Sequence, residues 1–503
     1  MELELNWERM NYHELLLDTQ VCREETQETI VPDSYPDILR IVEAGGQLCL
    51  TEKELKDGGV TVGGTVDGWL LYEPESGEGL CKIDYRIPFT VNLEAPGVTA
   101  QGRCVVRPIL GRIDARTLNP RKVLVRADIC ADVCVYEHRE LPVCCGMECS
   151  AEMGVQQLTG ERRAYLTTAV CEKPFSVYEE VHAPAGLDAE GELVCMSAQA
   201  WCTEARLIGS KLVIKGEAGV RVRYLAGGQM NSTCIPVNFS QILEVEGAGE
   251  QADCSVSLYV TNVECTRAGE DGRQLNIALE LMGQAVVADS YPLVALQDAY
   301  STCGELTVEM QNFFVTDLLE RYVRPQSMRE LLETQVQAKS VVDASVRVCR
   351  VSVSGANMET QLQADVMYLD ERDQLHTTGR TILISGQLDV PEGVQCRMSC
   401  TCPGEAFAAV TAGGLEVRFN LEMRGCMTRQ EPVVSVKNAR WTERSRDAQE
   451  SRPSVVMRAA MPGESLWDIA KAYGTTIRRI GQANGLEQDE APVGRLLLIP
   501  AGR

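Results

Sequence analysis

A series of strand-like segments occurs three times along the chain, and this repetition constrains the fold more than any other feature. In each copy the first segment alternates apolar and polar residues and ends on a tyrosine, at residues 60–72, 212–224 and 357–368. Alternation with a period of two is typical of a strand with one buried face. An internal repeat of this length indicates that one structural unit is used several times.

The segments that follow keep the same order in every copy. A closing segment with one apolar face ends each copy, and we expect its central residues Val125, Ile277 and Val417 at the same position of a sheet. Before it, a leucine and an acidic residue precede a turn, and a segment with a cysteine comes next. These residues are Leu93-Glu94 and Cys104, Leu243-Glu244 and Cys254, and Leu388-Asp389 and Cys396.

The sequence therefore predicts a mainly β protein: three repeated antiparallel β-domains with short helical connectors, followed by a small β-α-α-β module. Helical spacing of Leu15, Leu16 and Val21 predicts a helix near the N-terminus, and residues 328–336 echo residues 13–21. The predicted divisions are a helical or extended segment at 1–37, β-repeats at 38–140, 187–290 and 336–435, a connector at 141–186, a helical connector at 291–335, a flexible linker at 436–455 and the last module at 456–503.

Charge and hydropathy exclude several classes of protein. The chain has 503 residues and a net charge of −24, which disfavours a nucleic acid as main partner because phosphate binding needs clustered Lys and Arg. No apolar run approaches the ~20 residues of a membrane span. The first ten residues are acidic and lack the apolar core of a signal peptide. We therefore expect a cytoplasmic protein without a membrane span.

Cysteine and histidine usage carries a second set of expectations. There are 21 cysteines but only four histidines, and neither a CxxC nor an HExxH spacing occurs. We expect reduced thiols in strands, nearly all of them free, with no metal site and no cofactor. Acidic groups are expected on solvated faces, so no catalytic residue is predicted and the protein is expected not to be an enzyme. Examples are Glu148, Glu152, Asp370, Glu371 and Asp373.

Residues 456–503 differ from the rest of the chain. They carry a net charge of +1, whereas residues 1–455 carry −25. Ser465 is placed to cap a helix, and Asp468 three residues later completes a capping box that contains Asp. Thr476 can cap a second helix, and a short apolar strand ends the chain. An apolar stripe at helical spacing is formed by Leu466, Ile469, Ala470 and Tyr473.

This last module resembles the LysM domain. The matching residues are Gly463-Glu464-Ser465-Leu466, Ile469-Ala470, Gly474, Asn484 and the closing run from Gly494 to Pro500. LysM domains bind N-acetylglucosamine polymers in a groove between two loops. The resemblance implies groove or partner-binding roles for Pro462, Gly463, Glu464, Ser465, Leu466, Trp467, Asn484, Leu486, Glu487 and Pro492.

Two features of the module bear on its ligand. The second groove loop has three acids and no aromatic residue on which a sugar could stack, so we expect a protein partner, with an N-acetylglucosamine polymer as the alternative. Trp467 follows the core position Leu466 and has two readings. It is either an exposed binding residue beside Leu466 and Leu486, or it packs under the first strand of the module.

The complete order of domains resembles one family. The segment Pro32-Asp-Ser-Tyr-Pro-Asp-Ile38 and the Leu93-Glu94 segment are similar to SPOCS domains, which precede a C-terminal LysM domain in spore coat morphogenetic proteins like SpoIVA-interacting protein L. The resemblance implies a non-enzymatic adaptor of endospore coat assembly. It would lie in the mother-cell cytoplasm at the forespore surface and bridge that surface to the coat basement-layer ATPase SpoIVA through its LysM module. The alternatives are a protein of the cell wall or cortex that binds peptidoglycan, and a cell-wall hydrolase targeted by LysM.

Overall fold

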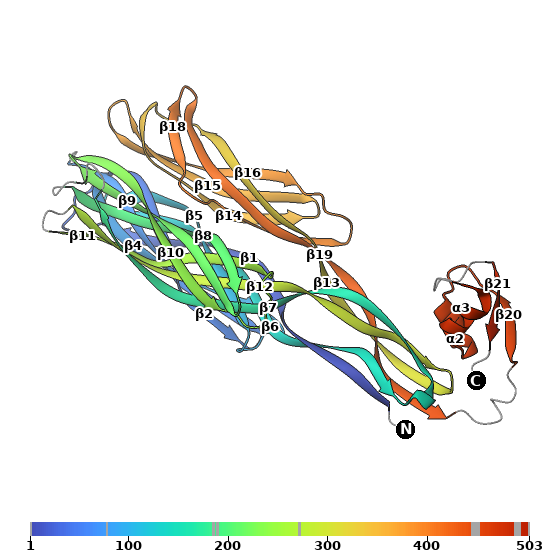
Figure 1. Ribbon diagram of the computed structural model, residues 1–503. Helices are drawn as coiled ribbons and strands as arrows, with labels where there is room; N and C mark the ends of the chain where they lie inside the picture. The colour runs from blue at the N-terminus through green and yellow to red at the C-terminus, as the bar shows by residue number, and fades with distance from the viewer. Residues whose placement is uncertain are drawn as a thin grey trace.

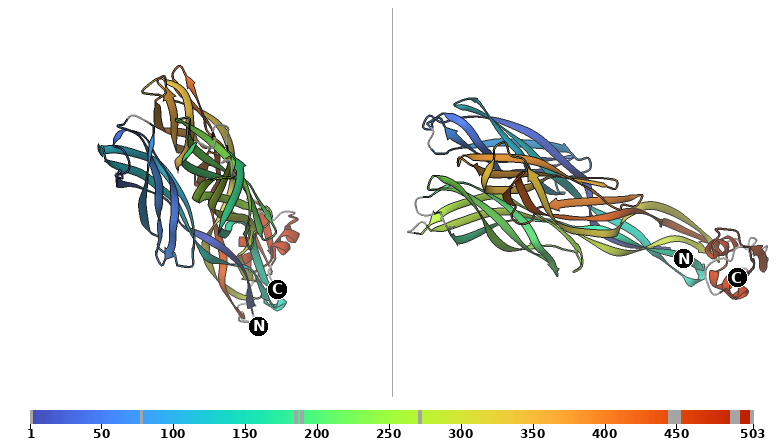
Figure 2. Two further views of the ribbon diagram at one scale, coloured as in Figure 1. Left: turned by 90° about the vertical axis from the view of Figure 1, so that its left-hand side faces the viewer. Right: turned by 90° about the horizontal axis from the view of Figure 1, so that it is seen from above.

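Three elongated β-sandwiches lie side by side and narrow together into one stalk, and a small module lies beside the far end of the stalk (Figures 1 and 2). The computed structural model describes residues 3–76, 79–183, 187, 191–269, 273–443, 453–486 and 494–500. Within these ranges almost every element is an antiparallel strand. The mainly β fold class is therefore confirmed.

Each repeat consists of two antiparallel sheets. In repeat 1 the sheets are β1-β6-β5 and β2-β3-β4, in repeat 2 β7-β12-β11 and β8-β9-β10, and in repeat 3 β13-β19-β17, where β18 also pairs with β19, and β14-β15-β16. The strands of repeat 1 are β1 (Leu3–Ile30), β2 (Ile38–Lys56), β3 (Gly59–Pro74), β4 (Cys81–Glu94), β5 (Arg103–Asn119) and β6 (Lys122–Cys149). Those of repeat 2 are β7 (Val155–His182), β8 (Glu192–Ile208), β9 (Lys211–Ala226), β10 (Gln229–Glu244), β11 (Asp253–Ala268) and β12 (Gln274–Ser301). Those of repeat 3 are β13 (Gly304–Leu332), β14 (Ala338–Ser354), β15 (Asn357–Asp370), β16 (Leu375–Gln387), β17 (Val394–Thr401), β18 (Phe407–Thr411) and β19 (Gly414–Glu443).

The repeated sequence pattern corresponds to a repeated structure. The three tyrosine-ending segments lie in the central strands β3, β9 and β15, and the three closing segments begin β6, β12 and β19. Val125, Ile277 and Val417 each lie three residues after the first residue of their strand, and all three are buried in the core of their sandwich. Their predicted equivalence is confirmed.

The long strands also share a β-bulge. In β6, β12 and β19 the residue that lies 23 positions after the first has no partner in the register: Cys145, Gln297 and Lys437. Bulges are specific features that redirect side chains and raise the local twist of a strand. Their occurrence at one position in three repeats indicates that the stalk was duplicated together with the sandwiches.

The stalk is built by the outer halves of the first and last strand of each repeat. These strands form three ribbons, β1/β6, β7/β12 and β13/β19, which pack around shared apolar cores. The three fully buried residues just before the bulges meet in one of these cores. They are Cys144, Leu296 and Val436.

The helical reading fails for the N-terminal segment, where the extended alternative is observed, and for the connector at 291–335. Residues 8–22 belong to β1, and residues 328–332 belong to β13. A bulge leaves Leu16 unpaired between Leu15 and Leu17. The bulge interrupts the period of two, and the resulting cluster of leucines imitates helical spacing. The echo between residues 13–21 and 328–336 joins unequal positions, because His13 pairs with His138 late in β6 whereas Met328 pairs with Phe419 early in β19.

The other predicted divisions overlap with these strands. Pairing groups residues 3–149, 155–301 and 304–443 into the repeats, so both predicted connectors contain sandwich and stalk strands. Residues 436–443 of the predicted linker belong to β19, and residues 444–452 lie outside the described residues. The boundaries of independent domains stay a prediction.

The last module has the predicted β-α-α-β order. It consists of β20 (Val455–Ala459), α2 (Leu466–Tyr473), α3 (Ile477–Asn484) and β21 (Leu496–Pro500). One 3-10 turn, η1 (Ala151–Met153), joins the first two repeats. None of the helices in the described ranges has the length and hydrophobicity needed to cross a membrane.

Nearly all cysteines are free, as expected, but one pair is bonded. Cys22 and Cys130 form a disulfide bond between β1 and β6, whereas the other 19 cysteines are free. The register of the two strands places the two residues directly opposite each other, which brings their sulfurs within bonding reach. Several free thiols are held inert by their surroundings: burial raises the pKa of Cys49 and that of Cys104 to about 11.

Candidate functional site

The LysM-like module is held together at the start of α2. The side chain of Ser465 accepts a hydrogen bond from the backbone N–H of Asp468 (3.1 Å), and the Asp468 carboxylate accepts one from the backbone N–H of Ser465 (3.1 Å). These bonds form the predicted capping box. Hydrogen bonds from Ser465 lower the pKa of Asp468. Gly474 ends the helix in the left-handed conformation that favours glycine.

The first groove loop combines exposed and structural residues. Pro462, Gly463 and Ser465 are exposed. Glu464 is engaged within the module, because its carboxylate accepts bonds from Arg458 Nη2 (2.6 Å) and from the backbone N–H of Met461 (3.2 Å). The exposed surface of this loop is therefore formed mainly by its first residues and the helix cap.

The second side of the predicted groove is described only in part. The amide side chain of Asn484 donates to the backbone oxygens of Ile480 (2.8 Å) and Leu498 (2.6 Å), and it accepts from the Leu498 backbone N–H (2.7 Å). Asn484 thus ties α3 to β21. Leu486 is half-buried against the core of the module, which includes the fully buried Leu466. Glu487 and Pro492 lie outside the described residues.

Trp467 has a position that neither sequence reading proposed. It is only 8% exposed, and its ring packs edge-to-face on Tyr300 of the stalk with the ring centroids 4.8 Å apart. Its indole N–H donates to the Asp298 carboxylate at 2.8 Å. Lys471, one turn further along α2, donates to both oxygens of the same carboxylate at 2.7 Å. Trp467 therefore faces another part of the same chain.

At the opposite end of the molecule, the three sandwiches meet around a buried arginine. The guanidinium of Arg223 donates through Nη1 to Glu43 of repeat 1 (2.6 Å) and through Nε to Asp343 of repeat 3 (2.7 Å). Burial alone would lower the pKa of Arg223, but the two carboxylates raise it well above the ordinary value. Arg223 and its two carboxylate partners therefore join all three repeats. Sequence reasoning missed it, although Arg223 precedes its repeat tyrosine where the other copies have the apolar Leu71 and Met367.

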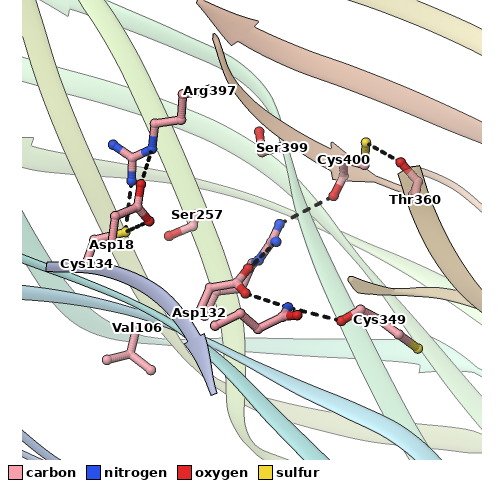
Figure 3. Close-up of polar contacts among 12 residues, drawn as sticks. Asp18, Val106, Asp132, Cys134, Ser257, Cys349, Thr360, Arg397, Ser399 and Cys400 are labelled. Carbon is pink, nitrogen blue, oxygen red and sulfur yellow. Dashed lines mark hydrogen bonds and ion pairs between the residues drawn. The ribbon is translucent and has the colours of Figure 1, made fainter. Parts of the chain in front are cut away.

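A second set of polar contacts lies among the three repeats (Figure 3). Arg397 of repeat 3 donates to Cys134 Sγ (2.9 Å) and pairs with Asp18 (3.1 Å), both from repeat 1. Thr360 Oγ1 and Cys400 Sγ lie 3.4 Å apart within repeat 3. Gln284 of repeat 2 is fully buried, and its amide binds both the N–H (3.0 Å) and the oxygen (2.7 Å) of Val106. The sandwiches are thus joined by the buried bonds of Gln284 and by the half-exposed contacts of Arg397.

A cavity of about 540 Å³ lies among the three repeats. Its arginines are paired with carboxylates: Arg107 with Asp132, for example, and Arg347 with Asp365 at 2.9 Å. Charge is therefore largely balanced inside the cavity. Within the described ranges no group of three or more His, Cys, Asp or Glu side chains could hold a metal ion.

Among the acidic residues named in the sequence analysis, Asp370 has a clear structural role. Asp370 accepts hydrogen bonds from the backbone N–H groups of Arg372 (2.8 Å) and Gln374 (2.9 Å), and its other oxygen contacts the His376 ring (3.1 Å). The backbone bond from Gln374 is the main cause of its lowered pKa. This carboxylate therefore closes the turn between β15 and β16.

Two known domain families match parts of the chain. Residues 37–118 and 195–267 match the SipL SPOCS domain, and residues 462–500 match the LysM domain. The matched SPOCS segments lie in repeats 1 and 2. No curated protein and no solved structure matches the chain.

The chain thus combines SPOCS domains of the SipL type with a C-terminal LysM domain, in the order that the sequence resemblance indicated. This combination identifies it as a sporulation-related protein that contains LysM. Both domain families are non-catalytic.

Proposed function

We propose that this protein is a non-enzymatic adaptor of endospore coat assembly. It would work in the mother-cell cytoplasm at the forespore surface and bind a SpoIVA-like coat ATPase through its LysM module. The observation that carries the proposal is the combination of SPOCS domains with a LysM module at the far end of a long rod (Figure 1). A rod with a small binding module at its tip is suited to joining two layers.

The geometry supports recognition by the first groove loop. Pro462, Gly463 and Ser465 are exposed, and no described residue of the rod packs over them. The LysM match also favours a second ligand, an N-acetylglucosamine polymer. A protein partner and an N-acetylglucosamine polymer are captured in different binding assays, so experiment can distinguish the two ligands.

A paired binding experiment tests the proposal. The full chain is mixed with purified SpoIVA-like ATPase and, separately, with insoluble peptidoglycan. We expect capture of the ATPase and loss of that capture in Pro462→Arg, which places a bulky charge in the exposed loop. The matched control is Lys437→Gln, which removes an exposed charge on the repeat 3 ribbon and should bind normally.

The thermal midpoint of each variant shows whether the module stays folded. Capture of the ATPase that is unaffected by Pro462→Arg would contradict a role of the groove. Retention on peptidoglycan without capture of the ATPase would establish the glycan alternative instead.

A further inference from the structure

We infer that the tip of the repeat 2 ribbon is a docking site for the LysM module of the same chain, which holds the module in one orientation with its first groove loop outward. The contact joins β12, near residue 298, to α2, about 170 residues later in the sequence. The inference concerns the chain alone and does not depend on which partner the module binds.

The centre of the contact is the carboxylate of Asp298. It accepts from the indole N–H of Trp467 and from the ammonium group of Lys471, so both of its oxygens are occupied. Trp467 and Lys471 are four residues apart and therefore lie on one side of α2. A charge-assisted bond that is partly shielded from water is stronger than a neutral one. The ion pair also fixes the rotation of the helix.

Apolar contacts surround this carboxylate. Tyr300 and Leu158 of the ribbon belong to the same apolar cluster as Leu466, Ile469 and Leu497 of the module. The hydroxyl of Tyr300 donates to the backbone oxygen of Thr475 at 2.8 Å. Burial, with a smaller effect of Asp298, raises the pKa of Tyr300 to about 12, so the hydroxyl remains a donor. The core of the module thus continues into the stalk.

The docking site occurs in one repeat only. Asp298 follows the shared bulge of β12, and the equivalent positions in β6 and β19 hold Gly146 and Asn438. Tyr300 is likewise replaced by Glu148 and Arg440. The same bulge in three ribbons therefore presents a carboxylate and an aromatic ring in repeat 2 alone. The three ribbons share the bulge, so the contact with the LysM module depends on the residues that repeat 2 carries there.

The bulge lies beside a glycine of the neighbouring strand. A Cβ atom on Gly160 would lie 2.2 Å from Nε2 of Gln297, the residue that the bulge leaves unpaired. The glycine therefore gives room to the end of this flexible side chain, and bulges redirect the residues beside them.

The orientation has a direct consequence for binding. The helices of the module lie toward the stalk, and its two strands lie on the far side (Figure 1). Pro462 and Gly463 remain exposed in the docked state. The outer face of the strands is also exposed and apolar: Val455, Met457, Leu496 and Leu498. Docking therefore presents these surfaces at the end of the rod and covers the side of α2 that bears Trp467.

The test measures how the module tumbles in the full chain. Docked to the rod, its backbone amides should show the fast transverse ¹⁵N relaxation of the 55.3 kDa protein. Asp298→Lys repels Lys471 and should lower the relaxation rates of residues 455–486 several-fold, because the module then tumbles as a small domain. The reciprocal pair Asp298→Lys with Lys471→Glu should restore most of the docking. Glu309→Lys is the matched control, since it reverses the charge of one partner in an exposed ion pair on the repeat 3 ribbon.

Three results would overturn the inference. The first is a module that already tumbles independently in the unmodified chain. The second is an Asp298→Lys variant with unchanged relaxation. The third is a dimer by light scattering whose formation depends on Asp298, because the module would then dock on a second copy. Recovery of slow tumbling in the reciprocal variant, with a monomeric mass, supports docking within one chain.

Discussion

The two ends of the rod differ in how equivalent residues of the three repeats are used. We call the end formed by the sandwiches the head and the end formed by the stalk the tip. At the head, the bulge residues of β2, β8 and β14 meet in one apolar cluster, and they are Val42, Val194 and Val342. At the tip, three equivalent bulges occur, and among the described residues those that follow the bulge of repeat 2 contact the LysM module. Equivalent positions keep similar residues where the repeats pack on one another, and they diverge where one repeat alone has a partner.

The head contains one exception that sharpens this comparison. Arg223 takes the place of an apolar residue, and Glu43 and Asp343 from the neighbouring repeats neutralise it. A buried ion pair does not necessarily stabilise a fold, but the loss of one partner leaves an uncompensated charge. The three residues therefore specify how the repeats associate.

The largest expected effect follows from removing one of these carboxylates. Asp343→Ala leaves Arg221 without its carboxylate partner and leaves Arg223 with Glu43 alone, and it should cost about 3–5 kcal/mol of unfolding free energy. Chemical denaturation measures the loss. The triple variant Arg223→Met, Glu43→Gln, Asp343→Asn removes the charges of Arg223, Glu43 and Asp343 together, leaves Arg221 alone unpaired, and should be more stable than Asp343→Ala. The exposed pair Glu204–Lys215 is the control, because Glu204→Ala should change little.

A smaller effect is expected between repeats 1 and 2. Gln284→Ala leaves the backbone N–H and oxygen of Val106 unpaired and buried, which should cost about 1–3 kcal/mol. The equivalent residue in repeat 3 is Arg424, whose side chain is 49% exposed. Arg424→Ala should therefore have a much smaller effect in the same denaturation experiment. Equal losses in the two variants would contradict a specific role for the Gln284 amide.

At the other end of the rod, Ser465→Ala should destabilise the LysM module alone. The substitution removes the cap that satisfies the Asp468 backbone N–H and should cost about 1 kcal/mol. Hydrogen exchange of α2 measures the loss, and the sandwich strands should exchange as before. Ser454→Ala, at an exposed residue outside the helices, is the control. A change that spreads into the sandwiches would show that the module and the repeats unfold together.

The smallest expected effect is a dependence of the stalk on pH. Burial, followed by the repulsion of His138 and Arg103, lowers the pKa of His13, whereas backbone bonds at Thr167 and Thr168 oppose the shift. The lowered folded pKa favours neutral His13 in the native state. The contribution of His13 to the free energy of unfolding is therefore complete above the unfolded pKa of about 6.5, and it is lost as the pH falls below that value. The thermal midpoint should fall less between pH 7.5 and 5.5 in His13→Gln than in the unmodified chain, and an equal fall would contradict this assignment.

Much of the fold could be predicted because its signal is repeated. Alternation in three copies identified the central and closing strands, and the cap residues of α2 identified the LysM module. The first strand of each repeat was not recognised, because a bulge breaks the alternation in every copy, at Leu16, Thr168 and Leu319. A bulge shifts the alternation of apolar and polar residues by one position although the strand continues. Sequence periodicity alone cannot distinguish this shift from the end of the strand.

The contacts between distant elements could be predicted least. Asp298 lies about 170 residues from Trp467, and nothing near either residue indicates the other. Only the alignment of the three closing strands distinguishes Asp298 from Gly146 and Asn438. The alignment of the central strands β3, β9 and β15 likewise shows Arg223 in an otherwise apolar position. Departures from a repeat are thus the sequence signal that locates its unique contacts.

The central claim, that one rod holds its own LysM module at one ribbon tip, is tested most directly by cross-linking. A zero-length carbodiimide joins a carboxylate to an amine in contact with it, and Asp298 lies 2.7 Å from Lys471. Mass spectrometry of an equal mixture of ¹⁴N- and ¹⁵N-labelled chains then separates bonds within one chain from bonds between chains. We predict an Asp298–Lys471 cross-link whose two peptides always carry the same isotope, at every protein concentration. Absence of this cross-link, or a cross-link in which the isotopes are mixed, would contradict the account.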